Sequence, residues 1–299
     1  QGFGLGGEWG GAVLLAVENA PPGHEARYGS MPQQGSPLGF IIANGLILAI
    51  AALMPDARFL RWGWRIPFAA SAVMVAIGLW IRLKITETPA FAAAMQQRET
   101  VAVPLGSVLK HHWRKVLAGG VVATCTFMVF YVMSVFCLNY GTRTLGYSFK
   151  TFIGYQLLTI PLFSLMVIFS GWAADRRWSQ AGMQKAGALA AILCGALMPL
   201  MFKGHELGLL VTYLALLSAT MGLAYGALGA YLPSLFPVNV RYTGASVAFT
   251  IAGILGGAFT PIVTTVLVQW GGVALVGAYL AGSGVLSLIA LWFLEKRGK

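Results

Sequence analysis

The sequence predicts an all-α integral membrane protein, and three observations carry that prediction. Of the 299 residues, 58% are hydrophobic and only 10% are charged, whereas an ordinary soluble domain has roughly 25% charged residues. The mean hydropathy of the chain is +0.75. Nine apolar runs follow one another, and each is long enough to cross a hydrocarbon core ~30 Å thick as a helix. A soluble core could not absorb this much apolar surface.

The nine predicted spans are separated by short polar connections. They cover residues 1–18, 34–55, 64–83, 116–138, 153–174, 184–202, 208–231, 245–269 and 272–294. The three cysteines fall inside spans and are expected to be small buried thiols, without metal spacing. The net charge of +11 resides in the connections rather than in one patch. We therefore expect lipid as the surrounding partner, no nucleic acid, no metal and no cofactor.

The longest connection, 84–115, divides the chain into two parts. We expect residues 1–83 to form one group of helices, 84–115 to form a cytoplasmic linker, and 116–299 to form the second group. The pair His111-His112 in this linker is not expected to bind metal, because adjacent residues on a helix point in different directions. The chain opens inside an apolar run without Met, so we expect further helices before it, giving about nine spans of an original twelve.

The distribution of Lys and Arg predicts the orientation. Alternate connections carry 14 and 6 of the 20 basic residues, and the richer set belongs on the cytoplasmic side. This set includes the end of the chain, so the C-terminus is expected inside the cell. Nine crossings that end inside must begin outside.

Glu8 is the acidic residue placed well inside an apolar span. A carboxylate in hydrocarbon costs about 2.5–3.5 kcal/mol even on forgiving scales, and burial disfavours its charged form. We expect Glu8 to be buried and name it as the proton-coupling candidate. Two alternatives stay open: a structural pair with a basic residue upstream, and direct contact with a solute.

Other polar side chains inside the predicted spans are candidates for lining a solute cavity. Each could equally be a contact between helices. The residues we select are Asn44, Tyr131, Asn139, Gln156 and Tyr225.

Charged residues at the ends of spans are candidates for a latch that holds one conformation. Asp175 closes a span at the predicted cytoplasmic face, beside Arg176, and we expect it to pair with a nearby arginine in one state. Glu18 and Arg27 bracket a Pro-containing turn in the same way. Arg27-Tyr28 recurs 214 residues later as Arg241-Tyr242, which suggests two related halves and adds Arg241 to the candidates. The alternative is that all are exposed loop charges, each pair worth under ~1 kcal/mol.

Enzyme motifs are absent from the sequence. It has no Gly-rich phosphate loop ending in Lys-Ser or Lys-Thr, no His-Glu-x-x-His and no Gly-x-Ser-x-Gly. We therefore expect neither ATP-driven transport by this chain nor hydrolysis.

Several segments, taken in order, resemble the major facilitator superfamily and, within it, the metabolite:proton symporter family. They lie at 6–12, 18–22, 27–30, 64–68, 87–91, 171–177, 235–237 and 241–244. The resemblance implies twelve helices in two six-helix halves, of which this chain would hold helices 4 to 12. It also implies that Glu8 is the family's acidic position in helix four and Asp175 the acidic position of its loop signature. Where the signature usually continues Gly-Arg-Arg, this chain has Trp178-Ser179-Gln180 after its arginines.

The resemblance implies a monomeric inner-membrane transporter that imports a small organic solute with a proton by alternating access. A carboxylate such as a dicarboxylate, a ketoacid or shikimate is favoured, and proline or betaine comes next. Two other hypotheses stay open: the protein is a uniporter, or it is a non-transporting membrane sensor or scaffold on the same fold.

Overall fold

The computed structural model describes residues 2–83, 104–202 and 206–298, and within these ranges every regular element is a helix. The N-terminal group of helices comprises α1 (Gly2–Glu18), α2 (Glu25–Gln33), α3 (Gly35–Leu53), α4 (Asp56–Arg61), η1 (Gly63–Arg65) and α5 (Ile66–Arg82). The stretch 84–103 of the predicted linker lies outside the described residues.

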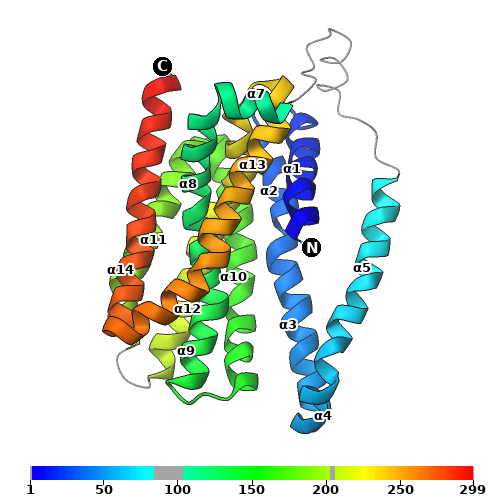
Figure 1. The fold of residues 1–299 in the computed structure, drawn as a ribbon, viewed down its shortest axis with the longest axis vertical. Helices are drawn as coiled ribbons and strands as arrows, with labels where there is room; N and C mark the ends of the chain where they lie inside the picture. The colour runs from blue at the N-terminus through cyan, green and yellow to red at the C-terminus, as the bar shows by residue number, and fades with distance from the viewer. Residues whose placement is uncertain (1, 84–103, 203–205, 299) are drawn as a thin grey trace.

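The C-terminal group of helices follows the linker (Figure 1). The predicted linker itself contains α7 (Pro104–His111) and the start of α8. The C-terminal group comprises α8 (Trp113–Tyr131), η2 (Val132–Phe136), α9 (Cys137–Arg143), α10 (Phe149–Arg176), α11 (Gln180–Met201), α12 (Leu207–Ser234), η3 (Val238–Val240), α13 (Arg241–Ala252), η4 (Gly253–Ala258) and α14 (Phe259–Gly298). The long helices run roughly side by side along one axis, with the C-terminus and α7 at one end and α4 at the other.

Seven continuous helical stretches of the described chain are long and apolar enough to cross a membrane. One of them, Val238–Lys296, spans 59 residues and breaks at Gly271-Gly272. Gly272 has φ 68°, a left-handed conformation that glycine adopts without a steric penalty, so this stretch holds two spans, as predicted. α1 has 17 residues and matches the predicted span 1–18. The membrane fold predicted from hydropathy is confirmed.

Helix α12 lies at the centre of the bundle and packs against α10, α11, α8 and α2. Its glycines allow this approach, because a Cβ on Gly222 would collide with the carbonyl of Phe163 and one on Gly226 with that of Val167. Close approach of backbones through small residues is the usual way that membrane helices associate.

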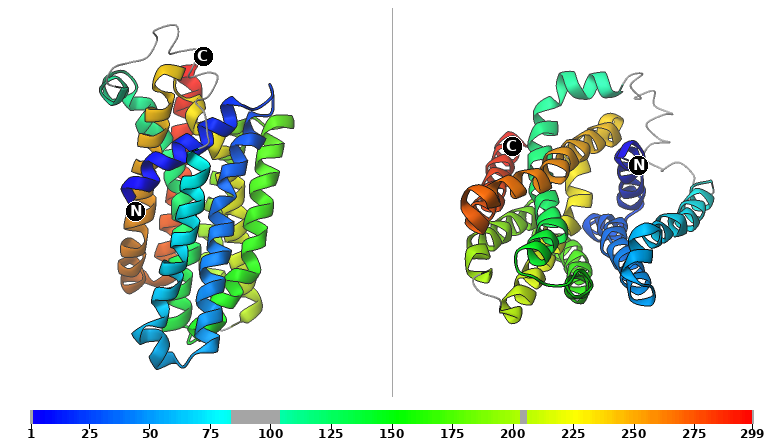
Figure 2. Two further views of the ribbon diagram at one scale, coloured as in Figure 1. Left: turned by 90° about the vertical axis from the view of Figure 1, so that its right-hand side faces the viewer. Right: turned by 60° about the horizontal axis from the view of Figure 1, so that its bottom comes forward.

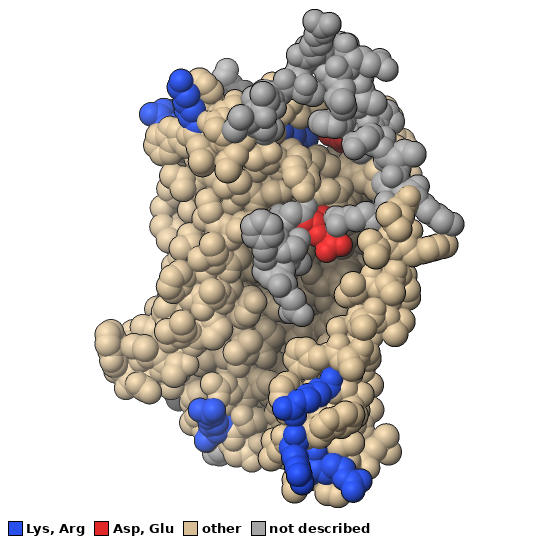
Figure 3. Space-filling view, turned by 45° about the vertical axis from the view of Figure 1, so that its right-hand side comes forward, with Lys and Arg blue, Asp and Glu red and all other residues tan. Residues whose placement is uncertain are grey.

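Helix α5 is the opposite case, because it stands at the edge of the molecule beside α3 (Figures 1 and 2). Nearly all of its described side chains are exposed, including Phe68, Met74 and Trp80. On the face drawn in Figure 3, basic side chains lie toward the two ends, mostly uncharged residues lie between them, and a hollow near the centre holds an acidic side chain.

Candidate functional site

The two groups of helices meet along α2, which packs against α10 and α12. Small residues make the contact close at one end of this interface. A Cβ on Gly229 of α12 would collide with the carbonyl oxygen of Gly29 in α2, and one on Gly171 of α10 would lie 2.6 Å from Ser30 Oγ. Ser30 is buried. The end of the interface that holds these residues is therefore tightly closed, and we call it the closed end.

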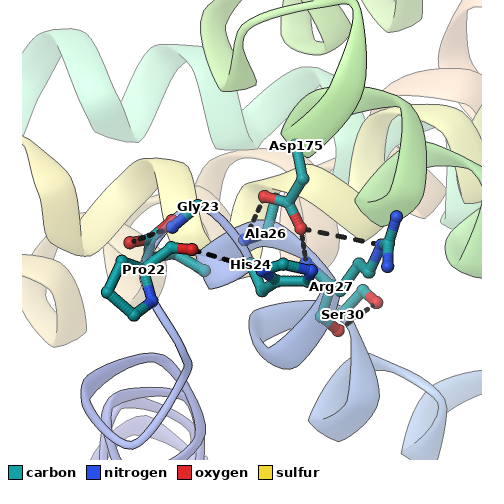
Figure 4. Close-up of polar contacts among 8 residues, drawn as sticks. Pro22, Gly23, His24, Ala26, Arg27, Ser30 and Asp175 are labelled. Carbon is teal, nitrogen blue, oxygen red and sulfur yellow. Dashed lines mark hydrogen bonds and ion pairs between the residues drawn. The ribbon is translucent and has the colours of Figure 1, made fainter.

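Asp175, at the end of α10, caps the first turn of α2 (Figure 4). Its Oδ1 accepts a hydrogen bond from the backbone N–H of Ala26 and its Oδ2 from that of Arg27, each at 2.9 Å. The residue before the helix, His24, makes no side-chain capping bond. The Asp175 side chain is only 4% exposed, and Arg27 Nε lies 4.0 Å from it. The carboxylate thus satisfies free N–H groups and faces the positive end of the helix dipole.

A second ionic contact crosses between the groups at the closed end. Arg241 Nη1, at the start of α13, lies 3.3 Å from Glu18 Oε1, at the end of α1. The Glu18 side chain is 8% exposed. The contacts are reciprocal: an acid of the C-terminal group meets Arg27 at the start of α2, and an acid of the N-terminal group meets Arg241. Sequence reasoning selected all four residues but did not assign their partners.

Arg176 takes no part in these contacts. Its side chain is exposed, and its guanidinium carbon lies 5.6 Å from the ring centroid of Trp172 on its own helix. Beside Asp175, a shallow pocket of about 460 Å³ is lined by both groups of helices. Its lining residues include Gly23 and Glu25 from one group and Ser179 and Tyr231 from the other.

At the opposite end, a single ion pair in the described chain joins the two groups. Lys150 Nζ, in the first turn of α10, lies 2.9 Å from Asp56 Oδ1 in α4. The side chains are 43% and 79% exposed, respectively. Sequence reasoning missed this pair, since both residues look like ordinary loop charges.

Glu8 is exposed in the described structure, so the expectation that it is buried is wrong here. Its neighbours on α1 explain this, because Trp9, Val13 and Leu14 take up the buried face of the helix, which packs on α2 and α13. No described segment covers the side on which Glu8 lies. An apolar span in the sequence shows that a residue lies at membrane depth, but not which face of the helix carries it.

The five cavity candidates are not joined to one another by hydrogen bonds in the described part of the chain. Asn44 is half-buried and donates to the carbonyl of Phe40 in its own helix. Tyr131 and Asn139 are also half-buried. Tyr225 is buried, and its hydroxyl accepts from Ser36 at 3.2 Å, across the two groups.

Gln156 is buried and donates hydrogen bonds to a distorted turn next to it. Its Nε2 donates to the carbonyls of Met133 (2.8 Å) and Ser134 (3.1 Å). These lie in η2, a π-helical turn between α8 and α9, where the backbone pattern of an α-helix is interrupted. Its amide donor is therefore already used within the protein.

Gln33 is a contact residue that sequence reasoning missed. It is fully buried in α2, accepts from Trp9 Nε1 at 2.8 Å, and donates to the carbonyl of Tyr225 at 3.0 Å. The next residue, Gln34, is bonded to Ser164 of α10 in both directions. Two adjacent amides at the edge of an apolar span were a usable signal, because polar groups at such positions usually bridge helices.

Comparisons with known proteins agree with this architecture. Residues 1–258 match the family model described as Major Facilitator Superfamily. The inner membrane metabolite transport protein YhjE of Escherichia coli is 41% identical over 97% of this chain and 67% of its own length. The shikimate transporter of Escherichia coli is 30% identical over 97% of this chain and 68% of its own length. The chain thus spans about two thirds of the length of these relatives.

A more distant relative and a solved structure extend the comparison. The proline/betaine transporter of Salmonella typhimurium is 27% identical over 90% of this chain and 55% of its own length. The proton:xylose symporter XylE has the same fold, with a TM-score of 0.71 at 15% identity over 95% of this chain and 66% of that one.

The matched family consists of transporters rather than enzymes, which agrees with the missing enzyme motifs. The membrane-spanning helices and the relatives also place the protein in a lipid bilayer, where it acts on small solutes. The chain is a multi-pass membrane protein that belongs to the Major Facilitator Superfamily.

Proposed function

We propose that the full-length protein imports a small organic solute together with a proton by alternating access. The observation that supports this most strongly is the cap that Asp175 places on α2, since it joins the two groups of helices at one end of their interface. For a solute to pass between the groups, this contact must break when the closed end opens. A carboxylate held by two backbone N–H groups and one arginine can re-form the same contact after each cycle.

The solute is proposed from the relatives. A carboxylate such as a dicarboxylate, a ketoacid or shikimate comes first, since one relative is named a shikimate transporter. Proline or betaine comes second, after the proline/betaine transporter. The half-buried side chains of Asn44, Tyr131 and Asn139 are the solute contacts that we propose, because each residue remains partly exposed.

Glu8 is the proposed proton site. Its carboxylate lies on an apolar helix and directly precedes Trp9, whose ring is buried between the groups. Loading a proton would remove a charge from α1 at membrane depth. The excess of Lys and Arg in alternate connections supports a closed end that faces the cytoplasm, an inner-membrane location and a cytoplasmic C-terminus. We propose a monomer.

The test is uptake by full-length protein in lipid vesicles under an imposed proton gradient. Labelled shikimate, succinate, proline and glycine betaine are offered separately, with and without a protonophore. We expect one of them to accumulate, and the protonophore to abolish accumulation. Glu8→Gln is expected to abolish accumulation as well, while the matched variant Glu206→Gln, which alters an exposed acid before α12, leaves it intact.

Other outcomes contradict the proposal in different ways. Uptake that survives the protonophore indicates a uniporter. Binding of a solute without uptake indicates a membrane sensor or scaffold. Accumulation that persists in Glu8→Gln removes this residue from the proton pathway.

A further inference from the structure

Two contacts between the groups of helices are made by buried side chains, and a hydrogen bond between Trp9 and Gln33 links them. In the first contact, the ring of Trp9 in α1 stacks on Phe249 of α13, with centroids 3.8 Å apart and planes 5° from parallel. In the second, Gln33 of α2 donates to the carbonyl of Tyr225 in α12 at 3.0 Å. The link is the hydrogen bond from Trp9 Nε1 to Gln33 Oε1, at 2.8 Å.

Because these groups are buried, losing either hydrogen bond of Gln33 is costly. Gln33 is 0% exposed, and both ends of its amide are satisfied, one by each neighbour. A buried amide that loses a partner is costly, and so is a buried indole N–H. If α12 moved away from α2 alone, Gln33 would lose its acceptor. If α1 moved alone, the Trp9 hydrogen bond would be strained or lost.

We infer that Gln33 is a positioning residue that makes the α1–α13 and α2–α12 contacts form and break together. The inference rests on the proposed alternating access. Gln33 itself makes no hydrogen bond to Asp175 or Arg241 in the described structure. It acts by holding the Trp9 ring against Phe249 while its own amide is held by α12. The separation of the two groups at the closed end then becomes one cooperative step instead of two independent ones.

The chain offers a matched control in Gln184. This glutamine is also buried, and its Nε2 donates to the carbonyl of Ala224, the residue before Tyr225, at 2.9 Å. Its helix, α11, belongs to the same group as α12, so the bond does not cross the interface. If buried glutamines only stabilised the fold, substitutions at positions 33 and 184 would change the ratio of open to closed protein equally.

The experiment measures the open fraction at the closed end by double electron–electron resonance. Full-length protein carries spin labels at His24→Cys and Trp178→Cys, which lie on exposed turns of the two groups, in vesicles of phosphatidylethanolamine and phosphatidylglycerol without solute or gradient. The native cysteines are buried and are replaced in a parallel sample. The variants are Gln33→Met, Trp9→Phe, the two combined, and Gln184→Met.

We expect Gln33→Met to raise the ratio of open to closed protein about fivefold, which corresponds to one hydrogen bond of about 1 kcal/mol. Trp9→Phe keeps a ring on Phe249 but removes the N–H, and it is expected to raise the ratio as well. The combined variant should show no more than the larger single effect. Gln184→Met should change the ratio less than twofold, although its thermal stability falls as much as that of Gln33→Met.

Three results would overturn the inference: single effects that multiply in the combined variant, an unchanged ratio in Trp9→Phe, or an equal shift in Gln184→Met. The Trp9→Phe arm decides the matter even if Gln33→Met does not fold. Failure of the proposed function is seen separately, as absence of solute accumulation by the unmodified protein, because the open fraction is measured without solute.

Discussion

The two ends of the interface between the helix groups both carry ion pairs, yet their surroundings differ. The Lys150–Asp56 pair is short, at 2.9 Å, but Asp56 is 79% exposed. Arg27 Nε lies farther from Asp175, at 4.0 Å, but the carboxylate is buried and also accepts two backbone N–H groups. Exposed pairs are typically worth 0–1 kcal/mol, whereas hydrogen bonds to a buried charge are worth about 1.5–3 kcal/mol. Distance alone therefore ranks the two ends in the wrong order.

The closed end is also the end where the backbones of the two groups approach closely. At the closed end, Gly29 meets Gly229 and Gly171 meets Ser30 without room for a further methyl group. Farther along α3 toward α4, Gly45 has open space where a Cβ would lie. The closed end is thus held by backbone contact as well as by charge, and an exposed pair bridges the other.

The largest expected effect comes from Gly229→Leu. The new side chain would overlap the backbone of Gly29, and the backbone cannot give way as a flexible side chain does. We expect the closed form to lose about 3 kcal/mol, seen as a large fall in thermal stability and rapid maleimide labelling of Ser30→Cys. Gly45→Leu is the control and should be tolerated. Equal effects of the two variants would remove the packing difference between the ends.

Asp175→Ala comes next. The substitution leaves the N–H groups of Ala26 and Arg27 without their acceptor and the Arg27 guanidinium without its nearest acid. We expect a loss of about 2 kcal/mol, measured as a roughly 30-fold faster labelling of Ser30→Cys. Asp175→Asn keeps a carbonyl acceptor and should fall between. A labelling rate unchanged from the parent protein would show that the cap does not hold this end.

Arg241→Gln should have a smaller effect. The Arg241–Glu18 pair is only partly buried on the arginine side, at 25% exposed, so we expect about 1 kcal/mol, or about a fivefold change in the same labelling rate. Arg176→Gln removes an exposed arginine from the same end and is expected to change nothing. A larger effect at Arg176 than at Arg241 would contradict the assignment of the ionic contact.

The smallest effect is expected for Asp56→Ala. Water and salt screen this pair, so its loss should cost less than about 0.5 kcal/mol and should vanish at about 1 M salt, where the Debye length is ~3 Å. The effect would be measured as the change in distance between spin labels on exposed positions that flank the pair, with and without Asp56→Ala, at low salt and at about 1 M salt. An effect as large as that of Asp175→Ala would break the comparison between the ends.

Hydropathy in the sequence was enough to predict the membrane helices and the break before the last span, but not which helices are central. Helices α5 and α12 are both apolar enough to span a membrane. α12 carries Gly222, Gly226 and Gly229 where other backbones approach, while α5 carries large side chains that stay exposed. Small residues spaced three or four apart were the sequence signal for the central helix.

The candidate site was also predicted only in part from the sequence. Asp175, Glu18, Arg27 and Arg241 were selected because charge at the end of a span is conspicuous. Their partners depend on which helices become neighbours, and this is a property of the fold rather than of local sequence. The polar residues 25–33 were expected to be a connection, yet they form α2, because its first turn is capped from another helix. The π-helical turns η2 and η4 leave no trace in hydropathy.

The central claim is that the end closed by Asp175 and Arg241 must open during each transport cycle. A flexible bis-maleimide that links His24→Cys to Trp178→Cys would fasten the two groups of helices at this end, in full-length protein in vesicles. We expect the link to stop uptake of the transported solute, and a cleavable version of the linker to restore uptake when it is cut. Uptake at the full rate by the cross-linked protein would contradict the account.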